Sequence, residues 1–262
     1  MPARMRTLET VDRALQLLLA FDGEDDRELT VAALAARLGI HRSSASRLAA
    51  TLAQRGFLER AGAGDAFRLG PALGRLGLIA MGLRGLVAES REVMERLADD
   101  TRETVVLSVL EGSDCVDVAQ ASGPHLVGMR NWVGRRSPLH ASSDGKVFLA
   151  FAGAQPGPGR LPALTRRTIA SRRRLDEEIA RVRARGWAWV EGELEDGLNG
   201  AAAPVFDPGG RCVAALSVCG PAYRLPAERL PEVGPLAAAA AAEIRARLGG
   251  ATSADERRQR AL

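Results

Sequence analysis

The segment between residues 30 and 54 places small, apolar, glycine and cationic residues at the spacing of a helix-turn-helix. Thr30 is a suitable N-cap for a helix whose Leu34 and Ala35 face inward. Gly39 ends that helix, because only glycine enters a left-handed turn without steric cost. Two helices that cross steeply over so tight a turn need a small residue at the crossing, and Ala35 provides it. The segment therefore predicts two short helices joined by a tight turn.

The second of these helices has one apolar face and one polar, cationic face. Ala45, Leu48 and Leu52 recur at the i, i+3, i+7 spacing of a buried face. No acidic residue lies between His41 and Phe57, so the opposite face can enter the major groove of DNA. A generic three-helix core with a solvated face is the alternative. The residues predicted to contact DNA are Thr30, Arg42, Ser43, Ser44, Ser46, Arg47, Thr51, Arg60 and Arg68.

The last two of these arginines belong to a predicted hairpin. Strand-like runs at 57–60 and 66–69 flank a glycine-containing tip at 61–65. Such a hairpin forms the wing of a winged helix-turn-helix, where Arg60 and Arg68 would rest on phosphate. An ordinary exposed hairpin is the other interpretation.

Two more helices flank this region. Leu8, Val11, Leu15 and Leu18 recur at helical spacing and predict a first amphipathic helix. Residues 71–100 predict one long, glycine-dotted helix with apolar residues on more than one side, which suits contacts with both its own domain and a partner.

Composition restricts the class of protein more than its identity. The chain has 262 residues, 46% of them apolar, and a net charge of only +4, which permits a nucleic-acid partner without requiring one. Its three cysteines form no CxxC pair, which indicates a reducing compartment. Neither a signal peptide nor a membrane span is predicted, so we expect a cytoplasmic protein.

From residue 104 onward, strand-like runs alternate with helices. We expect helices near 142–151, 175–185 and 227–248, the last regular only in its second half because of Pro231 and Pro235. The 166–185 segment holds eight arginines, so it is either a second DNA surface or a solvated amphipathic helix. The expected strands are 104–110, 115–121, 127–133, 187–190, 201–206 and 212–219.

With these features, the chain resembles the IclR family of bacterial regulators along nearly its whole length. The residues that carry the resemblance are Thr10 to Leu15, Leu34 to Gly39, Arg47 to Leu52 with Gly56, Phe67 to Gly70, Gly134, Pro138 to Ser142, Gly145-Lys146, Arg183 with Gly186, Glu193 to Gly197, Ala202 to Val205, and Ser217 with Gly220-Pro221. The resemblance implies an α+β protein with a winged helix-turn-helix at 1–70, a linker and dimerisation helix at 71–100, a GAF/PAS-like antiparallel-sheet effector domain at 101–250 and a disordered tail at 251–262.

The resemblance also implies a small-molecule pocket in the second domain. Its predicted lining is His140, Ser143, Asp144, Glu193, Asn199, Gly200, Ser217 and Cys219. The sequence departs from the family at Gly200, where many members carry a polar or thiol side chain, at Asn199, which often replaces an arginine, and at Val190, where some place an acidic ligand contact. Other roles remain open: Ser143 as a helix cap, Cys219 as core, and Lys146, the sole lysine, as a surface charge.

The effector expected for this pocket is a small organic acid. Free backbone N–H groups at the start of the 142–151 helix favour an anion, and Ser143 and Ser217 add hydroxyl donors. The chain is then a regulator that binds a (pseudo)palindromic operator as a dimer or tetramer, with no cofactor. The alternatives are an architectural DNA-binding protein without a ligand and a hydrolase-like enzyme, although the common nucleophile and zinc motifs are missing from the sequence.

Overall fold

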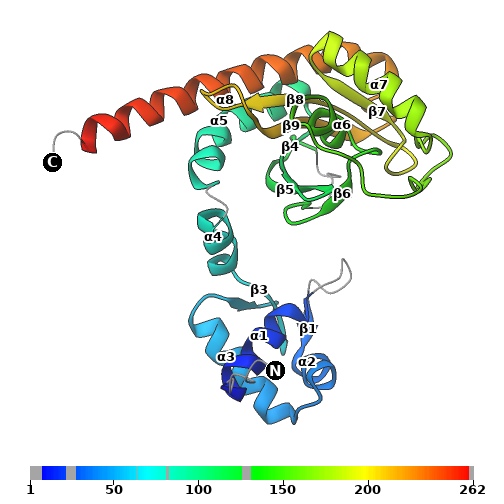
Figure 1. The fold of residues 1–262 in the computed structure, drawn as a ribbon. Helices are drawn as coiled ribbons and strands as arrows, with labels where there is room; N and C mark the ends of the chain where they lie inside the picture. Colours follow the sequence, from blue (N-terminus) through cyan, green and yellow to red (C-terminus); the bar gives the residue numbers. More distant parts are fainter. Residues whose placement is uncertain (1–7, 22–27, 63, 81–82, 126–130, 260–262) are drawn as a thin grey trace, which may run out of the picture. The chain divides into compact units, whose positions relative to one another are not determined.

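The computed structural model describes residues 8–21, 28–62, 64–80, 83–125 and 131–259 (Figure 1). The chain folds into two compact units, Met1–Arg84 and Gly85–Leu262. The first contains α1 (Glu9–Leu19), β1 (Leu29–Thr30), α2 (Val31–Leu38), α3 (Arg42–Gln54), β2 (Leu58–Arg60), β3 (Ala66–Leu69) and α4 (Pro71–Ala80). Its antiparallel sheet has the order β1-β3-β2.

The predicted helix-turn-helix is confirmed, together with the local interactions that shape it. Thr30 caps α2, and its Oγ1 accepts a hydrogen bond from the N–H of Ala33 at 3.2 Å. Gly39 adopts the left-handed conformation with φ 62° and ends α2. The N–H of Ile40 then donates to the carbonyl of Ala35 at 3.1 Å, which fixes the direction in which the chain enters α3.

The apolar stripe predicted to pack α1 against the domain is instead on its surface. Leu17 is fully buried and Leu18 half-buried, whereas Leu8, Val11 and Leu15 are 76%, 54% and 55% exposed. The spacing of Leu8, Val11 and Leu15 on one helical face is as predicted, but the core accepts the opposite face, which carries Leu17. Within the described part of the unit, this leaves the stripe without a covering element.

The hairpin of the first unit is held at its base by a close backbone approach. The N–H of Gly70 donates to the carbonyl of Phe57 at 2.8 Å, and a Cβ at Gly70 would lie 2.3 Å from the carbonyl oxygen of Gly56. Only glycine fits there. The third strand of this sheet, β1, is an element that the sequence did not indicate, because it has only two residues.

Two helices occupy the stretch where one long helix was predicted. α4 ends at Ala80, α5 (Arg84–Thr101) starts four residues later, and Leu83 between them is not helical. Residues 81–82 lie outside the described residues. Glycine disfavours the helix interior, and Gly85 stands at the start of α5.

The second unit is built on a six-stranded antiparallel sheet of order β6-β5-β4-β9-β8-β7. Its strands are β4 (Thr104–Glu111), β5 (Asp114–Ala121), β6 (Arg136–Pro138), β7 (Ala188–Glu191), β8 (Leu198–Phe206) and β9 (Cys212–Pro221). β4 and β9 pair at its centre, and β9 also pairs with β8, the other long strand. Most inner residues of these three strands are buried, as expected for a sheet covered on both faces.

Helices cover the two faces of this sheet (Figure 1). α6 (Ser143–Phe151) and α7 (Arg172–Arg185) pack on one face, where Phe148, Leu175 and Val182 join one apolar core. A 3-10 turn at Ala227–Arg229 leads into α8 (Leu230–Gln259), which packs on β8 and β9. Arg96 of α5 holds Glu243 of α8 at 2.7 Å, so these two helices are tied together.

Three sequence predictions in this unit differ from the structure. A strand was expected at 127–133. Residues 127–130 lie outside the described residues, and 131–133 do not form a strand. The edge strand β6 comes later in the chain. The prolines do not confine the last helix, because Pro231 occupies its first turn, where a proline is tolerated, and Pro235 is accommodated within it. α8 continues to Gln259 in the predicted 251–262 tail, of which 260–262 lie outside the described residues.

The fold class predicted from sequence is confirmed: an N-terminal helix-turn-helix unit precedes an α+β unit built on an antiparallel sheet. Within the described ranges, no helix has the length and apolar character needed to cross a membrane.

Candidate functional site

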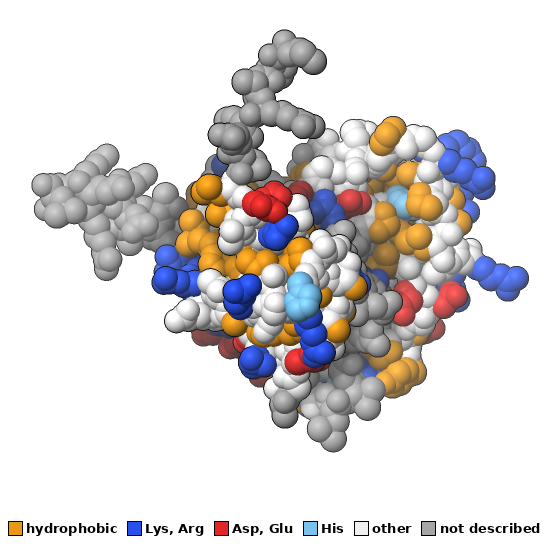
Figure 2. All heavy atoms as spheres, turned by 90° about the horizontal axis from the view of Figure 1, so that it is seen from below, with side chains coloured by type: hydrophobic (Ala, Val, Ile, Leu, Met, Phe, Trp, Pro, Cys, Tyr) orange, Lys and Arg blue, Asp and Glu red, His pale blue; other side chains and the backbone are white. Residues whose placement is uncertain are grey.

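The first candidate surface is the outer face of α3. Ala45 and Ala49 are fully buried beneath it, so this helix has a fixed rotation about its axis. The predicted contacts Arg42, Ser43, Ser46, Arg47 and Thr51 are all exposed, and Ser44 is half-buried. Figure 2 views the N-terminal unit from below and shows basic side chains scattered among uncharged polar and apolar ones.

Several side chains on α3 have partners that preset their orientation. The Nδ1 of His41, the N-cap of α3, accepts from the N–H of Ser43 at 3.2 Å. The Thr51 hydroxyl donates to the carbonyl of Arg47 at 2.8 Å, inside the helix. Arg42 pairs with Asp65 of the hairpin at 2.9 Å, with the two side chains 68% and 45% exposed. So exposed a pair contributes at most about 1 kcal/mol, and a phosphate can replace the carboxylate.

The two hairpin arginines are placed differently from each other. Arg68 of β3 pairs with Glu59 of β2 at 2.6 Å, and both are about half-exposed. Arg60 stacks over the ring of Phe67, with 5.1 Å from its guanidinium carbon to the ring centroid. The acidic partner of Arg68 offsets its charge, as Asp65 offsets that of Arg42.

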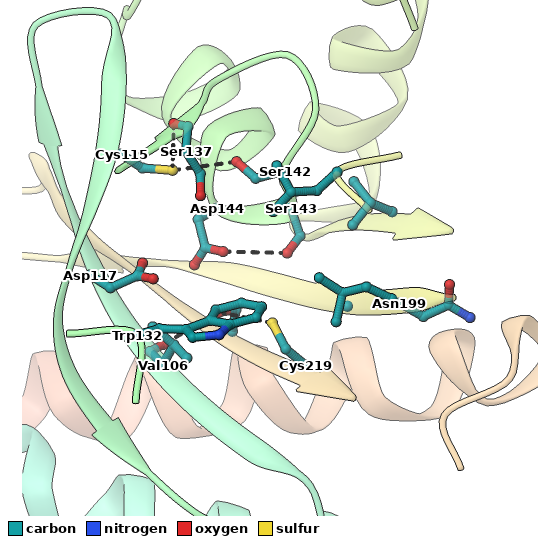
Figure 3. Close-up of a pocket in the computed structure, with 15 residues that line it drawn as sticks. Val106, Cys115, Asp117, Trp132, Ser137, Ser142, Ser143, Asp144, Asn199 and Cys219 are labelled. Atoms are coloured by element: carbon teal, nitrogen blue, oxygen red, sulfur yellow. Dashed lines mark hydrogen bonds between the residues drawn. The ribbon is translucent and has the colours of Figure 1, made fainter. Parts of the chain in front are cut away.

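The second candidate site is a pocket in the C-terminal unit, between the start of α6 and the strands of the sheet (Figure 3). It encloses about 390 Å³ with its open mouth included, but only about 20 Å³ can take the centre of a water molecule. That is room for about one water, so a larger ligand has to displace lining side chains. The lining residues are Val106, Cys115, Asp117, Trp132, Ser137, Ser142, Ser143, Asp144, Val190, Leu194, Leu198, Asn199, Gly200, Ser217 and Cys219.

Six of the eight predicted effector residues line this pocket, and two do not. The two that lie elsewhere are His140, whose Nε2 is 2.9 Å from the carbonyl oxygen of Pro162, and Glu193. Asn199 lines the pocket, but its amide is already used, because it accepts from the N–H of Gly192 at 3.0 Å and donates to the carbonyl of Leu225 at 2.9 Å. It therefore holds backbone segments together.

Gly200 is closely approached by its neighbours in the pocket wall. A Cβ at this position would lie 3.1 Å from the sulfur of Cys219, 3.3 Å from the carbonyl oxygen of Val218 and 3.4 Å from the hydroxyl of Ser143. The lack of a side chain at this position lets Cys219 and Ser143 pack tightly against β8.

Two buried carboxyl groups dominate the electrostatics of the pocket. Ser108 Oγ lies 2.7 Å from Asp117 Oδ1 and 3.3 Å from Asp144 Oδ1, so one hydroxyl faces both acids. Burial raises the pKa of Asp117 to about 7, and the neighbouring charge of Asp144 adds to the shift. Burial also raises the pKa of Asp144 to about 6, against hydrogen bonds from Ser217 and Ser108.

Asp117 was not among the residues predicted from sequence. The available signal was its place in a strand-like run, Cys115-Val116-Asp117, where Cys115 and Asp117 alternate on one face. Cys115 also lines the pocket, with its Sγ 3.2 Å from the carbonyl of Ser137 and 3.3 Å from Ser142 Oγ. Burial raises the pKa of the Cys115 and Cys219 thiols, so both are protonated and neutral at pH 7.

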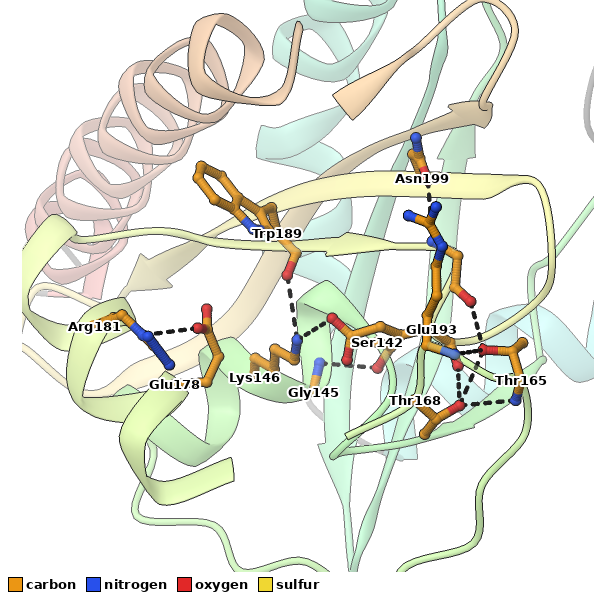
Figure 4. A network of polar contacts seen from close by, with 12 residues as sticks. Ser142, Gly145, Lys146, Thr165, Thr168, Glu178, Arg181, Trp189, Glu193 and Asn199 are labelled. Carbon is orange, nitrogen blue, oxygen red and sulfur yellow. Dashed lines mark hydrogen bonds and ion pairs between the residues drawn. The ribbon is translucent and has the colours of Figure 1, made fainter. Parts of the chain in front are cut away.

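Next to the pocket lies a buried ion pair (Figure 4). Lys146 of α6 is 1% exposed, so it is not the surface charge that the sequence allowed. Its Nζ lies 2.6 Å from Glu193 Oε1 and 3.4 Å from the carbonyl of Trp189. Loss of water raises the pKa of Glu193 and lowers that of Lys146, and their mutual attraction opposes both shifts.

The loop that carries Glu193 is also fixed through two threonines. The Thr168 hydroxyl donates to the carbonyl of Glu193 at 2.7 Å, and the Thr165 hydroxyl donates to that of Gly192 at 2.6 Å. Leu194, the next residue, lines the pocket. The ion pair and the threonines together determine where this wall of the pocket stands.

Comparison with family models assigns both parts of the chain. Residues 10–62 match the IclR helix-turn-helix domain, and residues 80–246 match the bacterial transcriptional regulator IclR C-terminal domain. Curated relatives cover nearly the whole chain. The HTH-type transcriptional regulator BhcR of Paracoccus denitrificans is 33% identical over 90% of this chain and 86% of its own. The transcriptional repressor IclR of Escherichia coli is 30% identical over 93% and 91%.

Solved structures share the fold over similar lengths. An IclR homolog from Microbacterium hydrocarbonoxydans, complexed with 4-hydroxybenzoate, has a TM-score of 0.73 at 27% identity over 92% of this chain and all of its own. The IclR of Thermotoga maritima has a TM-score of 0.72 at 24% identity over 93% of this chain and all of its own. The relatives are transcriptional regulators, which sets the enzyme alternative aside. The chain belongs to the IclR family of helix-turn-helix transcriptional regulators.

Proposed function

We propose that this regulator binds a (pseudo)palindromic operator as a dimer or tetramer, and that a small organic acid in the C-terminal pocket changes its affinity for the operator. The observation that supports operator binding most directly is the fixed rotation of α3, with Ala45 and Ala49 buried and Arg42 and Arg47 exposed. The contacts we propose are the nine predicted from sequence, with those on α3 reading bases and the hairpin arginines meeting phosphate.

Self-association is supported by the exposed stripe of α1. Leu8, Val11, Leu15 and Leu19 lie on one face and are between 54% and 76% exposed. We assign this face to a second copy of the chain, because a single small reading head gives limited affinity and a two-fold operator matches a two-fold dimer. A self-complementary apolar face is what such a symmetric interface requires.

The effector half of the proposal is supported by the pocket and by the relative complexed with 4-hydroxybenzoate. An architectural DNA-binding protein without a ligand would have no use for a pocket lined by buried polar groups. We keep the domain limits predicted from sequence, 1–70, 71–100 and 101–250, and a cytoplasmic location, where operator DNA lies, as parts of the proposal.

The test is DNA binding by the full-length protein, measured by footprinting on the DNA upstream of its own gene and of neighbouring genes. We expect a protected two-fold sequence, and a shift in its affinity on addition of a carboxylate that the protein binds in calorimetry. The coupling between effector and operator is typically about 1–3 kcal/mol. Absence of any protected site would contradict the operator half, and operator affinity that no bound acid alters would contradict the effector half.

A further inference from the structure

The polar groups that line the pocket include two acids and no base. Asp117 comes from β5 and Asp144 from the first turn of α6, and Figure 3 shows both carboxyl groups turned toward the same space. Asp117 and Asp144 are only 5% and 7% exposed. None of the fifteen lining residues, all within the described ranges, is Lys, Arg or His. The described lining therefore offers two acidic acceptors and no cationic donor.

Ser108, Ser143 and Ser217 supply hydroxyl hydrogens to these acids, the last through a hydrogen bond to Asp144, whereas each carboxylate can accept about four hydrogen bonds. The Ser108 hydroxyl has one hydrogen, and its shorter contact, 2.7 Å, is to Asp117 rather than to Asp144 at 3.3 Å. Ser143 Oγ reaches Asp144 Oδ2 only at 3.5 Å, a long hydrogen bond. A ligand that fills the pocket must then bring a donor of its own, because buried acceptors without partners are costly.

A positive charge already stands near the pair. The Arg135 guanidinium lies over the ring of Trp132, 4.6 Å from its centroid, and its charge lowers the pKa of Asp117. Its charge offsets part of the charge of the two acids, and it also faces Glu195 at 3.9 Å. A hydroxyl group can donate a hydrogen bond to the pair without changing this balance of charge.

We propose that the pocket selects a hydroxylated effector, whose hydroxyl group donates a hydrogen bond to the Asp117–Asp144 pair. This inference rests on the proposed function and narrows its organic acid to a hydroxy acid. Trp132, Val106 and Val190 supply the apolar walls for the carbon skeleton.

The experiment is calorimetry of the full-length protein with probes that differ only in the hydroxyl group. The pairs are 4-hydroxybenzoate with benzoate, 3-hydroxybenzoate with benzoate, and lactate with propanoate; benzylamine is the cationic probe. We expect at least one hydroxy acid to bind about tenfold or more tightly than its partner, because a site built for a hydroxyl rejects the analogue without it. Asp117→Asn and Asp144→Asn should reduce that preference to within about threefold, since a neutral acceptor binds the hydroxyl more weakly.

Asp114→Asn is the matched control, because Asp114 lies on the same strand in an exposed pair with Arg136 at 3.6 Å. It should keep the wild-type preference. Equal binding of the hydroxylated and unhydroxylated acids would overturn the inference and leave the effector function standing, and so would a preference for benzylamine. If no probe binds and none changes operator affinity, the effector half of the proposed function fails, and the inference fails with it.

Discussion

Lys146 Nζ lies 2.6 Å from Glu193 Oε1, and the side chains of the two residues are 1% and 10% exposed. Glu193 Oε2 is buried with no hydrogen-bond partner among the described residues. The pair is therefore not fully satisfied, and it lies next to a wall of the pocket. A buried pair of this kind gives little net stability, but it penalises any change that removes one partner alone.

Lys146→Met is accordingly expected to lower the free energy of unfolding by about 3–5 kcal/mol, because it leaves a buried carboxylate without its cation. Urea denaturation followed by circular dichroism measures this. Lys146→Met combined with Glu193→Leu should regain most of the loss, since neither charge then remains. Arg136→Met is the control: its pair with Glu111 is half-exposed, so it should cost less than about 1 kcal/mol. A single Lys146→Met variant as stable as the wild type would contradict the account.

The acid pair of the pocket predicts a pH dependence of stability. Burial raises the pKa of Asp117 to about 7 and of Asp144 to about 6, so between about pH 4 and pH 7 the folded state binds more protons than the unfolded state. The contribution of the pair to stability is then fully present below about pH 4 and is lost as the pH rises through 6 and 7. The total is on the order of a few kcal/mol.

Denaturation of the wild type and of Asp117→Asn/Asp144→Asn at pH 5, 6, 7 and 8 measures this contribution. The difference between the two proteins isolates the pair, because Lys146 and Glu193 are present in both. We expect the wild type to lose stability relative to the variant between pH 5 and pH 7, and little further change above pH 8. Parallel curves for the two proteins would show that the acids are not titrating in this range.

On the DNA side, Arg47→Ala tests whether the exposed face of α3 reads the operator. If the arginine binds a base, operator affinity should fall by about 1–3 kcal/mol with relaxed specificity at one position. If it meets phosphate, affinity should fall uniformly across sequences and the salt slope should shrink by about one. Arg173→Ala is the control on arginine-rich α7, where the side chain is 85% exposed. If Arg173→Ala alone weakens binding, the second DNA surface that the sequence allowed is the true one.

Gly200 predicts a variant that blocks the pocket and spares the fold. Ala at this position places a Cβ 3.1 Å from Cys219 Sγ and 3.4 Å from Ser143 Oγ, so the neighbours must shift by a few tenths of an ångström. We expect Gly200→Ala to weaken effector binding while operator binding without effector is unchanged, as calorimetry and anisotropy would show. Gly157→Ala, where the nearest side-chain atom is 3.7 Å away, is the control. Unaltered effector affinity in Gly200→Ala would place the ligand elsewhere.

The local elements were predictable because each depends on short-range pattern. The residue types of Gly39 and Thr30 indicate the turn and the helix cap. The spacing of Leu175, Ile179 and Val182 indicates the inward face of α7. The three-residue edge strand β6 was not found, because so short a strand has no period of its own and depends on pairing with β5.

The site was less predictable, since burial of a polar group depends on contacts between distant segments. Lys146 and Glu193 are 47 residues apart, and neither position alone indicates a buried ion pair. Ser108 and Asp144 are 36 residues apart and come together with Asp117 only when β4, β5 and α6 assemble. Family resemblance located the segment around Ser143, but it did not indicate the acid on β5.

The exposed stripe of α1 predicts where two copies of the chain associate. Periodicity places Leu8, Val11 and Leu15 on one face, whereas the core contains Leu17 from the opposite face. Apolar side chains in such a row cost free energy in water, which a second copy of the helix would recover at about 25 cal/mol per Å² of apolar surface buried. Leu15→Glu puts a charge on this face in each copy of the chain and leaves the core of the unit unchanged.

Sedimentation of Leu15→Glu at micromolar concentration should therefore show weaker self-association than the wild type, and operator binding should weaken with it because the two reading heads are no longer held together. The circular dichroism spectrum should be unchanged, since Leu15 is 55% exposed. Thr10→Glu introduces the same charge at an exposed position of α1 away from the stripe, and should behave as the wild type. If the Leu15→Glu variant assembles and binds the operator like the wild type, this stripe does not join the two copies. The interface then lies on another surface of the chain.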